Sequence, residues 1–170
     1  MRKIHLDMDG VLVDLESSVI EATGYRWGEI SSTKMWRIIT ERRPDIFASA
    51  RPRYDAYELV SGVLDFAFKY RMQVEILTAI PRVTTFPEAE SQKRFWIKYH
   101  FPFLLDVFKI GPRAPDKKNH ARLGDILIDD STLNTRDWGN AGGIAIRHVS
   151  AEESLKQLHT SGYRYMKLFH

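Results

Sequence analysis

Five short apolar runs are spaced along the chain, and helical patterns lie between several of them. Each run is continuous, whereas a strand with one solvated face would alternate between apolar and polar residues; continuous runs are typical of strands buried in a parallel sheet. The runs cover residues 4–6, 74–77, 107–110, 126–128 and 144–146. Strands that alternate with helices favour an α/β fold with a parallel sheet covered on both faces.

The segments between these runs carry apolar residues at three- and four-residue steps, the spacing of one helix face. One such set is Tyr57, Val60, Leu64 and Ala67, and another is Phe95, Tyr99 and Phe103. A last helix is predicted around residues 151–159, closing at Gly162, because glycine suits the position after a helix end. The predicted fold is therefore a Rossmann-like, five-stranded parallel sheet with helices around it.

The stretch between Asp14 and about Arg53 departs from this pattern. It contains no strand candidate, only helical stretches near residues 15–22 and 33–42, punctuated by Gly24, Gly28 and Pro44. We expect a small helical cap over residues 15–53, inserted after the first strand. Residues 1–14 and 54–170 would then form the α/β core.

Composition narrows the class of protein. With 170 residues, the chain fits one domain plus such a cap. No apolar run approaches the roughly 18–20 residues of a membrane span, and the charged N-terminus does not resemble a secretory signal, so we expect a cytoplasmic protein without a membrane partner. The chain has no cysteine, which excludes disulfides and thiolate zinc sites.

The net charge of +3 suits a small anionic substrate. The basic residues do not form the concentrated stripe expected of a nucleic-acid-binding protein, so a small molecule is favoured as the partner. The oligomeric state is not determined by the sequence.

Acidic residues follow two of the predicted strands. Asp7-Met8-Asp9-Gly10 comes directly after the first run, and Asp129-Asp130 comes directly after the fourth. Ligands of open parallel sheets bind outside the carboxyl ends of the strands. If these two strands are neighbours, four carboxylates converge there and repel one another unless they are protonated or a cation neutralises them. Ligation by oxygen alone suits Mg²⁺.

Neutral and basic groups follow two further strands. Thr78 ends the run at 74–77, where it could offer a hydroxyl to a phosphate, and Asp116-Lys117-Lys118 follows the run at 107–110. Each feature alone is more often structural: a strand-end hydroxyl, a turn or a helix cap. Their order and placement together favour a function.

In this order, Asp7-x-Asp9-Gly10, Thr78, the lysine pair and Asp129-Asp130 resemble the four motifs of the haloacid dehalogenase superfamily, from Asp7 to about Gly143. The chain is most similar to the deoxyribonucleotidases of that superfamily, which remove the 5′ or 3′ phosphate of nucleotides. Residues that carry this closer similarity are Asp14, Phe47, Pro52, Glu58-Leu59-Val60 and the 124–130 segment. Ala79, where those enzymes often have a hydroxyl residue, and a longer stretch between Lys117 and Asp125 are departures.

The resemblance implies a role for each matching residue. Asp7 would be the nucleophile and form an aspartyl-phosphate, while Asp9 would act as general acid and then general base. Mg²⁺ would be held by the Asp7 carboxylate, the Asp9 carbonyl and Asp130, with Asp129 hydrogen-bonding its waters. Thr78 and Lys117 would bind the phosphoryl oxygens.

We therefore expect a magnesium-dependent phosphatase that hydrolyses a phosphomonoester, in particular a nucleoside monophosphate. Alternatives are a polynucleotide-end phosphatase and a catalytically silent nucleotide-binding module. Lys118 is an alternative to Lys117 as the phosphate-binding lysine. The aromatic residues of the cap could stack on a base or form the cap's own core, and the second interpretation is favoured for each of Trp27, Trp36, Phe47 and Tyr54.

Overall fold

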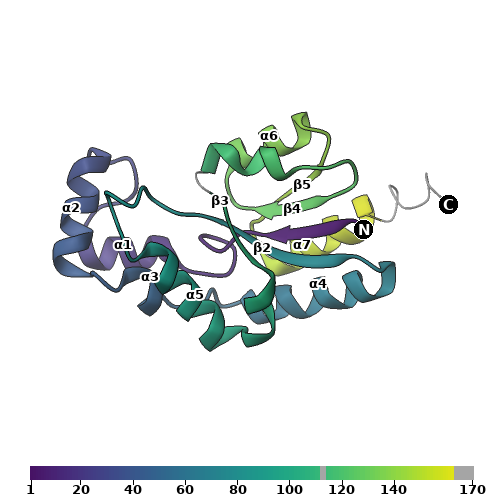
Figure 1. The fold of residues 1–170 in the computed structure, drawn as a ribbon, viewed down its shortest axis with the longest axis horizontal. Helices are drawn as coiled ribbons and strands as arrows, with labels where there is room; N and C mark the ends of the chain where they lie inside the picture. The colour runs from purple at the N-terminus through teal and green to yellow at the C-terminus, as the bar shows by residue number, and fades with distance from the viewer. Residues whose placement is uncertain (112–113, 163–170) are drawn as a thin grey trace.

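The protein is built around a sheet of five parallel strands (Figure 1). The structure is a computed structural model that describes residues 1–111 and 114–162. The strand order is β3-β2-β1-β4-β5. Their bounds are Lys3–Leu6 for β1, Gln73–Ala79 for β2, Phe108–Gly111 for β3, Ile126–Asp129 for β4 and Ile144–Arg147 for β5. The predicted α/β class and all five predicted strands are thus confirmed.

Helices cover both faces of the sheet. On one face, α4 (Ala56–Tyr70), α5 (Ala89–His100) and α7 (Ala151–Gln157) bury a large apolar core that includes Ile4, Leu6 and Ile76. On the other face, α6 (Thr132–Asn140) places Trp138 against Leu77 and Leu127. After α7, a π-helical turn, Leu158–Gly162, extends to the residue where the sequence predicted the helix to close. No helix in the described ranges is long and apolar enough to cross a membrane.

The aromatic spacing located α5 but indicated the wrong face and the wrong end. Phe95 and Tyr99 are 57% and 74% exposed, whereas Lys93, Trp96 and Ile97 form the buried side of the helix. Phe103 lies beyond α5, in a 3₁₀ helix η1 (Pro102–Val107). Ring contacts between exposed neighbours, such as Phe95 with Tyr99, follow the same spacing as a core face, so periodicity alone could not separate the two.

In the predicted cap, α1 (Leu15–Thr23), α2 (Ser32–Arg42) and α3 (Ile46–Ser49) lie beyond the carboxyl end of β1, at the left of Figure 1. The two connections to the core pair with each other: the Asp14 amide donates to the Arg51 carbonyl, and the Arg53 amide donates to the Leu12 carbonyl, both at 2.9 Å.

Helix α5, which belongs to the core, is hydrogen-bonded to the cap. The Trp96 indole donates to the Ala50 carbonyl at 2.7 Å, and the Gln92 side chain accepts from the Phe47 amide at 3.2 Å. The cap is therefore fixed over the carboxyl edge of the sheet.

Candidate active site

The sheet register brings the two acidic segments together. Leu6 pairs with Ile128, so the next residues, Asp7 and Asp129, lie level on adjacent strands. The two strands are therefore neighbours, which is the condition under which the acids were expected to converge. Because β1 has β2 on one side and β4 on the other, Asp7 lies where the chain order of the sheet reverses, the usual ligand position in such folds. Asp7, Asp129 and Asp130 each place one carboxylate oxygen within 4.8 Å of the others.

A tight loop after β1 orients these acids. The Met8 carbonyl accepts hydrogen bonds from three amides, those of Val11, Leu12 and Val13, so the chain reverses within a few residues. Gly10 has a φ of +77°, which an L side chain rarely adopts. A Cβ at Gly10 would also overlap the Asp130 carboxylate. Glycine at this position therefore permits both the turn and the close approach of Asp130.

Lys117 links the first and fourth strands. From the 3₁₀ helix η2 (Ala114–His120), its Nζ lies 2.8 Å from Asp7 Oδ1 and 2.7 Å from Asp129 Oδ2, and the side chain is buried. Lys118, the alternative, is exposed and lies 3.9 Å from Asp137. Both lysines lie on η2, which ends at His120.

The two acids after β4 differ in their hydrogen bonds. Asp129 accepts from the Ser131 amide, from Lys117 and, with both oxygens, from Asn134. The Asp130 carboxylate has no hydrogen-bond or ion-pair partner among residues 1–111 and 114–162. Asp7 Oδ1 is occupied by Lys117 and the Met8 amide at 2.7 Å, which leaves Oδ2 without a partner in the same ranges.

Crowding of acids shifts their pKa values. Burial and then repulsion from Asp7 raise the pKa of Asp129 to about 6. Although Asp130 is exposed to the cleft, partial desolvation by the surrounding protein and then repulsion from Asp7 and Asp129 raise its pKa to about 7. Burial lowers the pKa of Lys117, but Asp7 and Asp129 outweigh it and raise that pKa. One lysine does not fully offset three carboxylates, so these acids take up a proton or a cation more readily than isolated carboxylates do.

Lys93 is a site residue that the sequence analysis missed. This side chain of α5 is 1% exposed, and its Nζ donates to Asp9 Oδ2 at 2.6 Å, Thr78 Oγ1 at 2.7 Å and the Ala79 carbonyl at 2.8 Å. The available signal was a lysine at helical spacing with Ala89, Trp96 and Ile97, since a lysine on an apolar helix face needs a partner.

Thr78 does not reach the cleft surface. It is fully buried at the end of β2, and its hydroxyl is held by Lys93, while the next residue, Ala79, lines the cleft. A direct role of Thr78 in phosphate binding therefore stays a prediction. In the structure the Thr78 hydroxyl accepts a hydrogen bond from Lys93, and Lys93 also donates one to Asp9.

The two carboxylate oxygens of Asp9 differ in their contacts. Lys93 holds Oδ2, and Oδ1 has no hydrogen-bond partner. Burial raises the pKa of Asp9, and the adjacent Lys93 lowers it, with a net upward shift. A raised pKa keeps a proton on the carboxyl group at higher pH, which suits a general acid.

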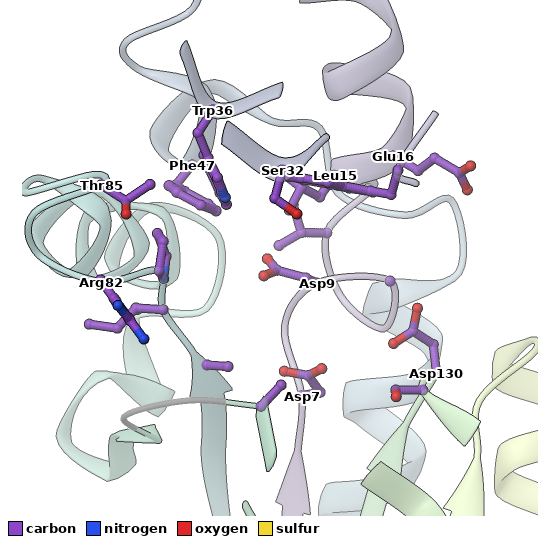
Figure 2. Close-up of a pocket in the computed structure, with 18 of the residues that line it drawn as sticks. Asp7, Asp9, Leu15, Glu16, Ser32, Trp36, Phe47, Arg82, Thr85 and Asp130 are labelled. Atoms are coloured by element: carbon purple, nitrogen blue, oxygen red, sulfur yellow. The ribbon is translucent and has the colours of Figure 1, made fainter. Parts of the chain in front are cut away.

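These groups lie at one end of a large cleft between cap and core, shown in Figure 2. Its volume is about 1210 Å³, and Asp7, Asp9, Lys117 and Asp130 are among its lining residues. Trp27, Trp36 and Phe47 line it from the cap. Phe47 is buried against Phe86 and belongs to the core, as the sequence favoured, whereas Trp27 is 41% exposed.

The partner-free oxygens fit a divalent cation. Asp7 and Asp130 each offer a carboxylate oxygen within 4.8 Å of the other, and carboxylate oxygen is the ligand type that Mg²⁺ prefers. The fit depends on the hydrogen bonds already made: Asp129 is saturated by its donors, so Asp7 and Asp130 are the carboxylates left to ligate.

Comparison with known protein families and curated proteins finds no relative of this chain. No protein-family model matches the chain, and no curated protein matches it at a significant level.

Proposed function

We propose that this protein is a magnesium-dependent phosphomonoester hydrolase that acts through an aspartyl-phosphate on Asp7 and takes nucleoside monophosphates as substrates. The observation that carries the proposal is that Asp7 Oδ2 and the Asp130 carboxylate, both without a partner in the described residues, line one cleft together with Asp9, whose Oδ2 is held by Lys93. The resemblance of the motifs to the haloacid dehalogenase superfamily supports the same reaction.

In the first step, a carboxylate oxygen of Asp7 attacks phosphorus, and the bond from phosphorus to the ester oxygen breaks. The Asp9 carboxyl group gives its proton to the leaving oxygen, which departs as an alcohol. In the second step, water attacks the phosphoryl group on Asp7, and Asp9, now ionised, takes the water's proton. The bond between phosphorus and the Asp7 oxygen breaks, which releases phosphate and restores the Asp7 carboxylate and the protonated Asp9 carboxyl group.

Charge neutralisation is the main demand of this chemistry, because an anionic nucleophile approaches an anionic ester. Lys117 lies 2.8 Å from Asp7 Oδ1, so its ammonium is close to any phosphoryl group that Asp7 receives. Asp7, Asp130 and the Asp9 carbonyl would hold Mg²⁺, which supplies positive charge at the phosphoryl oxygens when bound. Asp129, hydrogen-bonded to Lys117 and Asn134, would hold the lysine in place.

The nucleotide part of the proposal rests on the cap. Trp27 and Trp36 face the cleft, with ring centroids 5.3 Å apart, and each is incompletely buried. A flat apolar group such as a base could stack on either ring, an interaction of about 1–3 kcal/mol per base.

Phosphate release from a small aryl phosphate and from a panel of nucleoside monophosphates tests the reaction. Activity should require Mg²⁺ and vanish with EDTA, and Ca²⁺ should substitute poorly because its shell is larger and looser. Asp7→Asn should abolish turnover, whereas Asp65→Asn, an exposed acid on α4, should retain it. A phosphoryl group trapped on Asp7, seen by mass spectrometry after acid quench, would identify the nucleophile. Full turnover by Asp7→Asn or in metal-free buffer would refute the mechanism.

The substrate class is tested separately. Trp27→Ala should lower kcat/KM for nucleotides more than for the aryl phosphate, because only nucleotides carry a base to stack. Equal losses on both substrates would assign the ring to the cap's packing. A 5′-phosphorylated oligonucleotide in the same panel tests the alternative of a polynucleotide-end phosphatase.

A further inference from the structure

The cleft is larger than most pockets that bind one small molecule. Pockets for small molecules usually have volumes of roughly 300–1,000 Å³, and this one reaches about 1210 Å³. The reacting acids occupy only one end. Figure 2 shows Arg82 and Asp130 on opposite sides of Asp9.

Three arginines line the cleft, and two of them are uncommitted. Arg53 lies 3.5 Å from Asp55 and donates to the Val149 carbonyl at 3.1 Å. The exposed guanidinium groups of Arg37, on α2, and Arg82, after β2, make no hydrogen bond or ion pair within the described part of the chain.

Other charged residues along the rim do not offset these two arginines. Glu16, which also lines the cleft, pairs with Arg26 at 3.2 Å. Asp14 caps α1 by accepting from the Ser17 amide. The cleft therefore has an acidic floor around Asp7 and free positive charge on Arg37 and Arg82, one carried by the cap and the other by the core.

From this distribution we infer that the cleft binds a substrate with a second phosphate, remote from the one that Asp7 attacks, and that Arg37 and Arg82 bind it. The inference rests on the proposed function and extends it to a substrate class: nucleotides with two separate phosphates. Guanidinium groups recognise phosphate through paired hydrogen bonds. The second phosphate could belong to a free nucleoside bisphosphate or to the next phosphodiester of a short oligonucleotide.

An unpaired arginine on a surface is common and by itself indicates nothing. Here both arginines border one cavity, and they reach it from different elements, the cap helix α2 and the segment after β2. Within the described part of the chain no carboxylate pairs with either guanidinium, so both are available to an anion in the cleft. A second phosphate would give each guanidinium an anionic acceptor.

The test compares kcat/KM for a nucleoside 3′,5′-bisphosphate, the matching 5′-monophosphate and a 5′-phosphorylated dinucleotide, all with Mg²⁺. The parent protein should prefer the bisphosphate over the monophosphate by about tenfold or more. Arg37→Gln, Arg82→Gln and the double variant should reduce this ratio, the double variant to near one. Arg71→Gln, an exposed arginine at the end of α4 before β2, should keep the parent's ratio. A gain for the dinucleotide as well would indicate polynucleotide ends as the source.

Equal kcat/KM for bisphosphate and monophosphate in the parent, or a preference that survives in the double variant, would overturn the inference. If no substrate releases phosphate, the proposed function fails, and binding decides the inference instead. Quenching of the cleft tryptophans would then report affinity. Tighter binding of the bisphosphate that depends on both arginines would uphold the second-phosphate site, and equal affinities would reject it.

Discussion

Lys93→Met removes the ammonium group that connects Asp9, Thr78 and the Ala79 carbonyl while keeping an unbranched apolar side chain of similar length. The parent lysine is 1% exposed, and its Nζ also lies 5.0 Å from the centroid of the Phe47 ring. The substitution therefore tests whether the active-site carboxylate, the end of β2 and the cap depend on one buried charge.

The expected loss of stability follows from these contacts. The bond to the Asp9 carboxylate is charge-assisted and contributes about 1.5–3 kcal/mol. The Ala79 carbonyl loses its lysine donor, at a cost of about 1–3 kcal/mol. Relief from burying an ammonium offsets part of both. A net decrease of about 3 kcal/mol in the free energy of unfolding would lower Tm by about 6–12 °C for a domain of this size.

Catalysis should change through Asp9. Burial raises the pKa of Asp9 and Lys93 lowers it, so Lys93→Met should raise that pKa further. The general acid then stays protonated to higher pH, so the alkaline limb of the kcat/KM profile should shift to higher pH. The general base of the second step is less ionised at neutral pH, so kcat should fall there and recover as the pH rises.

Chemical denaturation and pH profiles of phosphate release measure both effects. Lys98→Met, an exposed lysine on the same helix, is the matched control and should match the parent in stability and profile. A Lys93→Met protein with the parent's Tm and an unmoved profile would contradict the assignment. If the variant is less stable but its pH profile of phosphate release is unchanged, Lys93 contributes to the stability of the fold and not to the pKa of Asp9.

Three further predictions concern the active-site loop, the lysine pair and the pH dependence of stability. Lys117→Ala should lower kcat/KM about a hundredfold, because a buried ammonium near the phosphoryl group is lost, whereas Lys118→Ala should stay within severalfold of the parent. Gly10→Ala should raise the Mg²⁺ concentration for half-maximal activity, because the added Cβ displaces the Asp130 carboxylate. Burial lowers the pKa of His148 to about 4. Since the unfolded chain takes up this proton near pH 6.5, stability should fall by up to about 3 kcal/mol as the pH drops from 6.5 to 4, and His148→Gln should remove this part of the fall in denaturation curves.

Each of these three predictions would be contradicted by a specific result. The reverse ranking of the two lysines would transfer the phosphate-binding role to Lys118. Gly24→Ala, at a similar φ of +78° but with nothing within 4 Å of the added Cβ, controls for backbone strain. An equal effect of both glycine variants on the Mg²⁺ requirement would exclude the steric reason. If the His148→Gln protein keeps the parent's full loss of stability in acid, other groups cause it.

The sequence determined those features that depend on neighbours along the chain. Strands β1 and β4 could be placed from the sequence because each is a continuous apolar run followed by acidic residues. Parallel strands share that edge, so the convergence of Asp7 with Asp129 followed once the strands were adjacent. The resemblance favoured Lys117 over Lys118, and of these two lysines it is Lys117 that contacts Asp7.

Only the tertiary structure decided which distant residues complete the site. Lys93 is 84 residues from Asp9 in the chain, and its burial depends on α5 packing beneath the cap. The same packing turned Trp96 inward and Phe95 outward, although both fit a helical pattern. It also occupied the Thr78 hydroxyl, which the sequence had assigned to phosphate. Local patterns specify which residues could face a core or a cleft, whereas the partner that a polar side chain finds depends on contacts between elements far apart in the chain.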